Sequence, residues 1–231
     1  MITARRSAWF ERLFAVYNRN LIARRFEGLR VAGLPNLKDR PACVPLVLYA
    51  NHSSWWDGLI AFQIGYEYGL EQYAMMEEQQ LRQYGLFRKL GAFSVARDNP
   101  RGALRSIGYA GDLLRGTARA LWIFPQGVTL PNDARPLNLY TGVAHIIKRV
   151  GRTYAAPVAM RYEFLDDFRP EALVRIGVPA PIGADAKAAK QLTAGLTESL
   201  ARTLDELRGD VVNGNLEGYE EIVAPRRRRS M

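Results

Sequence analysis

The chain has 231 residues, of which 48% are hydrophobic and 24% charged, a balance that suits one globular domain with a substantial core. No apolar run approaches the ~20 residues needed to cross a bilayer, and two distant histidines with one cysteine do not build a zinc site. The net charge of +9 lies at the two ends, because residues 1–30 carry a surplus of five and the arginines at 226–229 add four. An enzyme of nucleic acids more often carries basic residues across its working face, so we expect no nucleic-acid partner.

The first thirty residues predict an amphipathic helix. Arginines flank an apolar stripe, a pattern typical of a helix that lies in a membrane interface. Each basic residue near an anionic surface is worth about 1 kcal/mol, so both ends together are expected to hold the protein at a bilayer. The alternative is an ordinary amphipathic helix whose apolar stripe packs on the core. The stripe consists of Trp9, Leu13, Val16, Tyr17 and Leu21 at helical spacing, widened by Phe10 and Phe14.

The segment with the most chemical content follows the apolar run 44–50, which predicts a buried strand. His52 comes directly after it, and Asp57 stands five positions further on. Neutral imidazole can take a proton from a hydroxyl near pH 7, and a carboxylate on its far nitrogen holds the tautomer and stabilises the cation. Pairing requires a bend, because residues five apart on a straight helix lie about 140° apart. The alternative is a loop histidine and an aspartate that only satisfies N–H groups at a helix start.

Strand-like and helix-like segments alternate along the rest of the chain. Strands are predicted at 44–50, 72–76, 92–96, 120–124, 155–160 and 172–178. Helices are predicted at 57–69, 77–89, 101–116, 139–150 and 185–208, with Gly209 as the last stop. This alternation predicts an α/β fold with a mixed, mostly parallel sheet flanked by helices, in addition to the N-terminal amphipathic helix. Function sits at strand ends in such folds, so His52, Arg97 and Gln126 are expected to share one site.

Four blocks in order resemble a known family. They are Asn-His-x-x-x-x-Asp at 51–57, Gly91 with Arg97, Phe124-Pro125-Gln126-Gly127, and Ala156-Pro157-Val158. This succession resembles the glycerolipid acyltransferase superfamily of the 1-acylglycerol-3-phosphate, or lysophospholipid, acyltransferase type. The resemblance covers roughly residues 40–180 and also implies an α/β sheet with flanking helices.

The resemblance implies a role for each matched residue. His52 would act as general base on an acceptor hydroxyl, which attacks an acyl thioester directly, and Asp57 would orient His52. Arg97 would bind the phosphate of the acceptor, a task that suits a bidentate guanidinium. The loop block formed by Phe124, Pro125, Gln126 and Gly127 would also bind the acceptor.

The third block departs from the family pattern, in which glutamate is followed by glycine, threonine and, closely, an arginine. Here glutamine stands at 126 and valine at 128, and no basic residue appears before Arg135. Glutamine keeps the hydrogen-bonding capacity of glutamate but loses its charge. Two classes of acceptor therefore stay open: an ordinary phospholipid, or a hydroxyl without a neighbouring phosphate, as on a glycolipid.

The resemblance, together with the amphipathic N-terminal helix, implies a membrane-associated O-acyltransferase that transfers a fatty acyl group to a lipid hydroxyl. The donor would be acyl-CoA or acyl carrier protein, and the acceptor a lysophospholipid, a glycerol phosphate or a glycolipid. No bound cofactor and no metal is expected. The alternative is a non-catalytic lipid-binding protein that kept the fold, which Gln126 favours and the intact His52–Asp57 pair opposes. A hydrolase would lack its Gly-x-Ser-x-Gly elbow.

Two further residues and the boundaries complete the prediction. Cys43 is interpreted as a small buried residue, and a single cysteine indicates a reduced, cytoplasmic setting, peripheral on the inner face of the cell membrane. His145, in a helical segment, is interpreted as structural. Three parts are expected: an amphipathic membrane-interface region at 1–30, an acyltransferase domain at 31–209 and a basic tail at 210–231.

Overall fold

The protein is described by a computed structural model that covers residues 1–96, 99–183 and 188–226. Within these residues, nine strands form one sheet in the order β4-β3-β5-β2-β6-β7-β1-β9, with β8 paired to β6 beside this path. The strands are β1 (Gly28–Ala32), β2 (Leu46–Ala50), β3 (Gln72–Glu77), β4 (Ala92–Val95), β5 (Ala120–Ile123), β6 (Thr153–Glu163), β7 (Glu171–Ile176), β8 (Ala180–Ile182) and β9 (Glu220–Val223). The helices are α1 (Ala8–Arg25), α2 (Asp57–Glu67), α3 (Glu78–Gln83), α4 (Pro100–Leu114), α5 (Gly142–Val150) and α6 (Ala189–Val212), with 3-10 turns η1 (Leu34–Leu37) and η2 (Gly85–Leu90).

The strand directions bring the carboxyl ends of several strands to one edge of the sheet. Parallel pairing joins β4 to β3, β3 to β5, β5 to β2 and β2 to β6. The carboxyl ends of these strands therefore lie along one edge. Beyond them, β7 runs antiparallel to β6, β1 parallel to β7 and β9 antiparallel to β1. The mixed, mostly parallel α/β sheet that the sequence predicts is confirmed.

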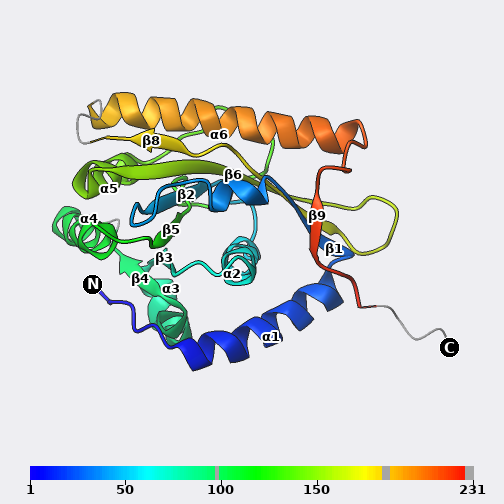
Figure 1. Cartoon of the computed structure of the whole chain (residues 1–231), viewed down its shortest axis with the longest axis horizontal. Coiled ribbons are helices and arrows are strands. Elements are labelled where there is room, and N and C mark those ends of the chain that lie inside the picture. The colour runs from blue at the N-terminus through cyan, green and yellow to red at the C-terminus, as the bar shows by residue number, and fades with distance from the viewer. Residues whose placement is uncertain (97–98, 184–187, 227–231) are drawn as a thin grey trace.

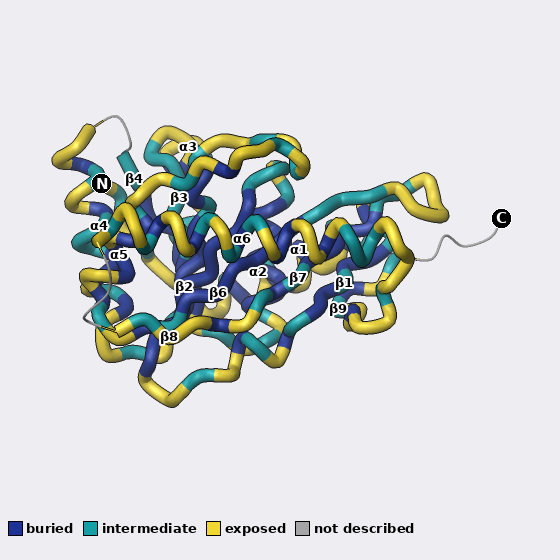
Figure 2. The backbone as a smooth tube through the Cα atoms, turned by 90° about the horizontal axis from the view of Figure 1, so that it is seen from above, coloured by how far each residue is buried: buried dark blue, intermediate teal, exposed yellow. Residues whose placement is uncertain are grey.

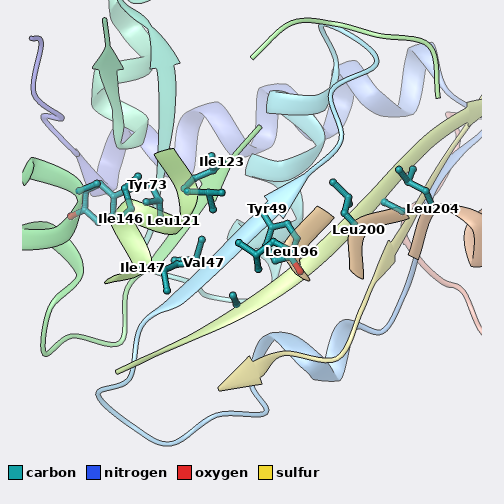
Figure 3. Close-up of a cluster of buried hydrophobic side chains, with 14 of the residues drawn as sticks. Val47, Tyr49, Tyr73, Leu121, Ile123, Ile146, Ile147, Leu196, Leu200 and Leu204 are labelled. Carbon is teal, nitrogen blue, oxygen red and sulfur yellow. The ribbon is translucent and has the colours of Figure 1, made fainter. Parts of the chain in front are cut away.

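Helices cover both faces of the sheet, as Figure 1 shows, with α4, α5 and α6 on one side and α1 and α2 on the other. The side chains of β2 alternate between the two layers. Val47 and Tyr49 pack among residues of α4, α5 and α6 (Figure 3), whereas Leu46, Leu48 and Ala50 pack against α2 and the end of α1. Every residue of β2 is buried, and Figure 2 shows the central strands as the most buried part of the chain. This two-sided burial explains why the sequence shows a continuous apolar run in place of an alternating one.

The predicted elements are present, with shifted ends. All six predicted strands occur, each overlapping its predicted range. The single helix predicted at 77–89 is instead α3 followed by η2, because the backbone of Tyr84 leaves the helical region before Gly85. The last helix does not stop at Gly209: it continues to Val212 and is followed by Gly214 in the left-handed conformation, φ 69°. Its predicted start at 185 lies outside the described residues.

Three strands are absent from the prediction, and they change the expected organisation of both ends. β1 spans the boundary expected between residues 30 and 31 and pairs with β7 inside the sheet. The stretch 210–231, expected to be a tail, contains the end of α6 and strand β9, which pairs with β1. Two exposed glutamates make up half of β9, a composition that suits an edge strand and hides it from a search for apolar runs. The arginines at 227–229 lie outside the described residues.

Cys43 is exposed, so its interpretation as a buried residue is wrong. It precedes β2 in a loop and has a positive φ of 62°, which places it in a turn and not in the core.

Four of the five residues at helical spacing in the predicted stripe of α1 face away from the protein, whereas Leu21 is half-buried. Trp9, Leu13, Val16 and Tyr17 are 66%, 58%, 62% and 60% exposed. Phe10 and Phe14 lie at the side of this stripe and pack into a small cluster with Phe62 of α2 and Phe87 and Leu90 of η2. The alternative of a stripe packed on the core is therefore wrong for these four exposed residues.

The opposite face of α1 holds the helix to α2 through polar contacts. The amide of Asn18 donates to the carbonyl of Leu59 and to Oε1 of Gln63, both at 2.9 Å. Arg19 pairs with Glu67 at 2.6 Å. The two buried hydrogen bonds of Asn18 fix which side of α1 faces inward, since a buried amide without partners is costly. Among the described residues, no helix combines the length and apolar character required to span a membrane.

Candidate active site

The turn between β2 and α2 brings the predicted pair together. β2 ends at Ala50, and Asp57 is the first residue of α2. The bend between them places Nδ1 of His52 2.7 Å from Oδ2 of Asp57. The geometry required by the sequence argument, a histidine on a turn and an aspartate in the first helical turn, is present. With Nδ1 directed at the carboxylate, Nε2 is the imidazole nitrogen left for a substrate hydroxyl.

The carboxylate of Asp57 is fully buried and accepts hydrogen bonds at both oxygens. The backbone N–H groups of Ser53 and Ser54 donate to Oδ2 at 2.7 and 2.9 Å. The hydroxyl of Tyr162 donates to Oδ1 at 2.6 Å. A buried carboxylate is tolerated when its oxygens are paired in this way. Asp57 therefore accepts from N–H groups at the start of α2 and also contacts His52. The catalytic interpretation and the helix-start interpretation of this residue are compatible.

Tyr162 belongs to this site but was not identified from the sequence. It lies near the end of β6, 105 positions from Asp57, and its ring packs 5.6 Å from that of Phe26. Burial, and then the negative charge of Asp57, raise the pKa of Tyr162 well above its ordinary value, so the phenol remains a donor. A tyrosine at the end of a predicted strand was the only available signal, and nothing in the sequence specifies its partner.

The block at 124–127 supports His52 from the side of β5. Oε1 of Gln126 accepts a hydrogen bond from the backbone N–H of His52 at 2.7 Å, and Gln126 is buried. The ring of Phe124 lies 5.0 Å from the imidazole. Gly127 has φ 69°, a conformation that suits glycine at this turn. Gln126 therefore anchors the histidine backbone with a neutral acceptor, a role that needs hydrogen-bonding capacity but not charge.

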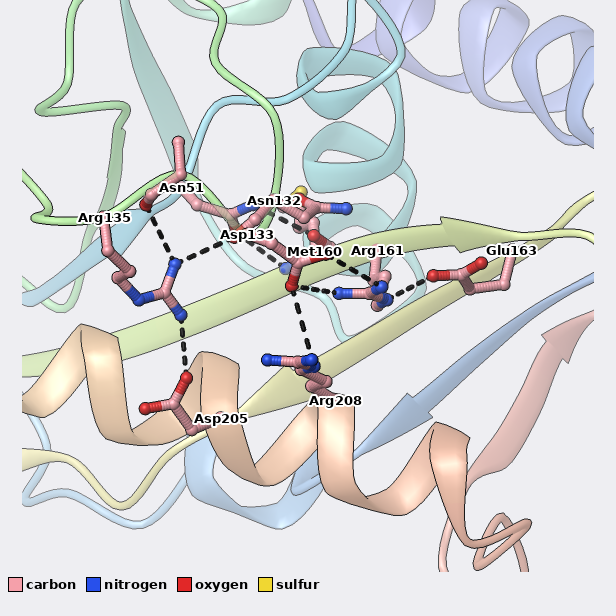
Figure 4. A network of polar contacts seen from close by, with 10 residues as sticks. Asn51, Asn132, Asp133, Arg135, Met160, Arg161, Glu163, Asp205 and Arg208 are labelled. Atoms are coloured by element: carbon pink, nitrogen blue, oxygen red, sulfur yellow. Dashed lines mark hydrogen bonds and ion pairs between the residues drawn. The ribbon is translucent and has the colours of Figure 1, made fainter.

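The loop after this block is tied to the neighbouring strand and helix, as Figure 4 shows. The amide of Asn51 bonds both ways with the backbone of Met160, at 2.8 and 3.0 Å, and donates to Oδ1 of Asn132 at 3.0 Å. Asp133 pairs with Arg161 of β6 at 3.0 Å. These contacts hold residues 128–136 over the end of the sheet.

Arg135, the first basic residue after the third block, pairs with a residue of α6 and with its own loop. Its guanidinium pairs with Asp205 of α6 at 2.8 Å and donates to two carbonyls of its own loop. It therefore does not replace the arginine expected close behind the third block. Arg97, the other expected phosphate ligand, lies outside the described residues.

A cavity of about 510 Å³ opens beside the dyad formed by His52 and Asp57. His52, Phe124, Pro125 and Gly127 line it, whereas Gln126 lies behind its wall. One end lies between α1, α2 and η2 and is strongly apolar. That end is lined by Phe14, Leu59, Phe62, Phe87 and Leu90.

The other end of the cavity lies between the first turns of α4 and α5. It is lined by Ala103 and Ile107 of α4, and by Thr129, Tyr140, Thr141 and His145. His145 is exposed and lines this end of the cavity, and its interpretation as a structural histidine stays a prediction. Within the described ranges, no group of three potential ligands could hold a metal ion.

The comparisons with known proteins agree with this geometry. The structure of the 1-acyl-sn-glycerophosphate (LPA) acyltransferase PlsC from Thermotoga maritima resembles this one with a TM-score of 0.63 at 15% identity, covering 86% of this chain and 79% of that chain. No curated protein matches the sequence. The family model named Acyltransferase matches residues 29–161, which include His52, Asp57 and the block at 124–127. Since this match extends over more than half of the 231 residues, the chain belongs to the Acyltransferase family.

Proposed function

We propose that this lipid acyltransferase transfers a fatty acyl group from a thioester, on coenzyme A or acyl carrier protein, to a hydroxyl of a lipid at a membrane surface. One observation carries the proposal: a histidine paired with a buried aspartate stands in the wall of a cavity with an apolar end. The dyad supplies a base, and the apolar end suits an acyl chain. A protein that only bound lipids would not require the dyad.

The proposed reaction needs no covalent enzyme intermediate. Nε2 of His52 takes the proton of the acceptor hydroxyl as its oxygen forms a bond to the thioester carbon. The tetrahedral intermediate then collapses, the carbon–sulfur bond breaks, and the imidazolium returns the proton to the leaving thiolate. Asp57 holds the imidazole and stabilises its cation through the 2.7 Å contact. The backbone N–H of Gly58, in the first turn of α2 at the cavity wall, is our candidate for stabilising the oxyanion.

The apolar end of the cavity is our proposed site for the acyl chain. Phe14, Phe62 and Phe87 meet there in edge contacts, with ring centroids of Phe14 and Phe62 5.1 Å apart. Burying a methylene group contributes about 0.8 kcal/mol, so this end alone can hold several carbons of a chain firmly. Since Phe14 belongs to α1, the acyl chain would lie directly beneath the helix that carries the exposed stripe.

The exposed stripe of α1 supports a peripheral association with the membrane, which we place on the cytoplasmic side. Four large apolar side chains in a row are exposed, and arginines lie at both ends of the helix. This combination suits a helix lying in the interface plane. A lipid acceptor would then reach the cavity without leaving the bilayer surface.

The double variant Leu13→Glu/Val16→Glu should lose liposome binding. Replacing two apolar side chains that would be buried in lipid removes about 1.5–3 kcal/mol each, so we expect at least a hundredfold weaker partition to vesicles containing anionic lipid. Flotation with vesicles measures it. The control is Val178→Glu/Val212→Glu, which makes the same charge change at valines that are 75% and 73% exposed elsewhere. Equal loss in both double variants would contradict a role for the stripe.

The activity itself is tested by thiol release from palmitoyl-CoA and from a palmitoyl carrier protein. Because Cys43 is exposed and would react with a thiol reagent, the assay uses Cys43→Ser protein throughout. Acceptors are glycerol 3-phosphate, lysophosphatidate and a neutral glycolipid. Acceptor-dependent release supports the proposal. Release without any acceptor indicates a thioesterase, and no release from folded, liposome-bound protein indicates the non-catalytic alternative.

A further inference from the structure

A second cavity, of about 520 Å³, lies on the other side of the turn that carries the dyad. His52 lines the first cavity, described above, and the next residue, Ser53, lines the second. The loop after β5 is shared in the same way, with Thr129 at the first cavity and Pro131 at the second. Turn and loop meet where the N–H of Leu130 donates to the carbonyl of His52 at 2.8 Å. The base therefore stands on the rim between two cavities.

The second cavity combines a cation with neutral hydrogen-bonding groups. Arg25, the last residue of α1, is exposed and brings a positive charge to the lining. Ser53 lines the inner side, and its Oγ is buried without a hydrogen-bond partner in the described part of the chain. Asn132 accepts from Asn51 through Oδ1 at 3.0 Å (Figure 4), and its NH2 group is a donor. A buried hydroxyl without a partner is costly, and a polar group of a ligand would relieve this cost.

Aromatic rings form another part of the wall. Trp56 and Phe26 meet edge to face with ring centroids 4.9 Å apart, and the ring of Tyr162 lies 5.6 Å from that of Phe26. All three residues line the second cavity. An apolar wall with a few polar groups suits a ligand with an aliphatic body, and a guanidinium suits an anion at one end of it.

Acyl transfer brings three groups to one carbon: the acyl chain, the leaving thiol and the acceptor hydroxyl. The apolar end of the first cavity is our proposed site for the acyl chain. The acceptor is expected at the α4 end, which Val95 and Ala103 line, because Arg97, its expected phosphate ligand, stands between them in the sequence. The leaving thiol and its carrier then need a third path from His52, and the second cavity supplies one.

We propose that the second cavity binds the phosphopantetheine arm of the thioester donor, the part that coenzyme A and acyl carrier protein share. The proposal rests on the acyltransferase function proposed above. Arg25 pairs with the phosphate, Ser53 and Asn132 bond to the amides of the arm, and the aromatic wall covers its aliphatic groups. The thioester crosses the rim at His52, with its acyl chain in the first cavity. When the carbon–sulfur bond breaks, the thiolate takes the proton from the imidazolium and leaves through the second cavity.

Two thioesters that differ only in the phosphate test the outer end of this site. Palmitoyl-pantetheine and palmitoyl-phosphopantetheine are compared as donors in neutral detergent micelles, with the acceptor that supports the fastest transfer. We expect Arg25→Gln to raise KM for the phosphorylated thioester about tenfold or more, the effect of one charge-assisted hydrogen bond, and to spare the unphosphorylated one. The matched control is Arg24→Gln, at an exposed arginine that is not part of the lining, and both KM values should equal those of wild type.

Ser53→Ala tests the inner end, because it removes the hydroxyl and keeps the backbone N–H that donates to Asp57. We expect KM for both thioesters to rise about 3- to 10-fold, the effect of one neutral hydrogen bond, with the ratio between them unchanged. Unchanged KM values contradict the inner contact. Palmitoyl-CoA and palmitoyl carrier protein should both show the effect of Arg25→Gln, since both carry the arm.

The outcomes separate this proposal from the function on which it rests. An equal change, or no change, of KM for the two pantetheine thioesters in Arg25→Gln overturns the site. An effect of Arg25→Gln with the carrier protein alone also overturns it, because the arginine would then contact the protein and not the arm. Transfer still occurs in these cases, so the acyltransferase function stands. Transfer from no thioester to any lipid acceptor, by protein with a wild-type unfolding midpoint, overturns both proposals.

Discussion

Alanine in place of His52 should lower kcat by about 10²–10⁴-fold, the usual contribution of a positioned general base. The loss arises because the acceptor hydroxyl is a poor nucleophile until its proton is taken, and His52 is the cavity-lining histidine whose imidazole is held by a buried carboxylate. KM for the thioester should change little, since the acyl chain is held at the apolar end. Steady-state rates with one acceptor and one donor measure both parameters.

The controls for His52→Ala distinguish chemistry from folding and binding. Liposome binding should equal that of wild type, because α1 and its exposed stripe do not contact the imidazole. The unfolding midpoint should fall only slightly, since the imidazole is partly exposed and its backbone bond to Gln126 is kept. A variant that retained acceptor-dependent transfer at the wild-type rate would show that the dyad is not the base.

The second large effect is expected at Asp57, and it is coupled to Tyr162. Asp57→Asn should lower kcat by about 10²–10⁴-fold. In wild type the hydrogen-bond donors around Asp57 share two carboxylate oxygens, whereas the amide offers only one acceptor oxygen and no longer fixes the imidazole tautomer. Tyr162→Phe keeps the packing against Phe26 but removes the hydroxyl that donates to Oδ1 at 2.6 Å. A hydrogen bond to a charged group contributes about 1.5–3 kcal/mol, so kcat should fall about tenfold or more.

A double-mutant cycle tests whether Tyr162 acts through Asp57. If it does, Tyr162→Phe has little further effect in the Asp57→Asn background, so the two losses are strongly non-additive. Fully additive losses would contradict a positioning role. Tyr154→Phe, made on the same strand, supplies the control and should leave kcat at the wild-type value.

Much of the fold could be read from the sequence because its signals are local. The buried strand β2, which lies within the predicted range 44–50, the turn after it and the helix that begins at Asp57 follow one another within a few residues. Their apolar runs and helical periods specify the elements, and alternation of the elements specifies the α/β class. The pairing of His52 with Asp57 is likewise local, since the carboxylate is held by backbone groups only three and four positions away. Strand β9 was not predicted, because an edge strand can pair without an apolar run in its sequence.

The sequence by itself determined the family blocks, the dyad and the central strands, all of which depend on residues close together in the chain. Only the tertiary structure decided which face of α1 is exposed, since Asn18 finds its partners on α2, 41 and 45 positions away. It alone brought Tyr162 to Asp57, Gln126 to the backbone of His52, and His145 to the mouth of the same cavity. These contacts join residues at the ends of different strands. Which strand ends lie close together is set by the order and register of the sheet, which no short stretch of sequence encodes.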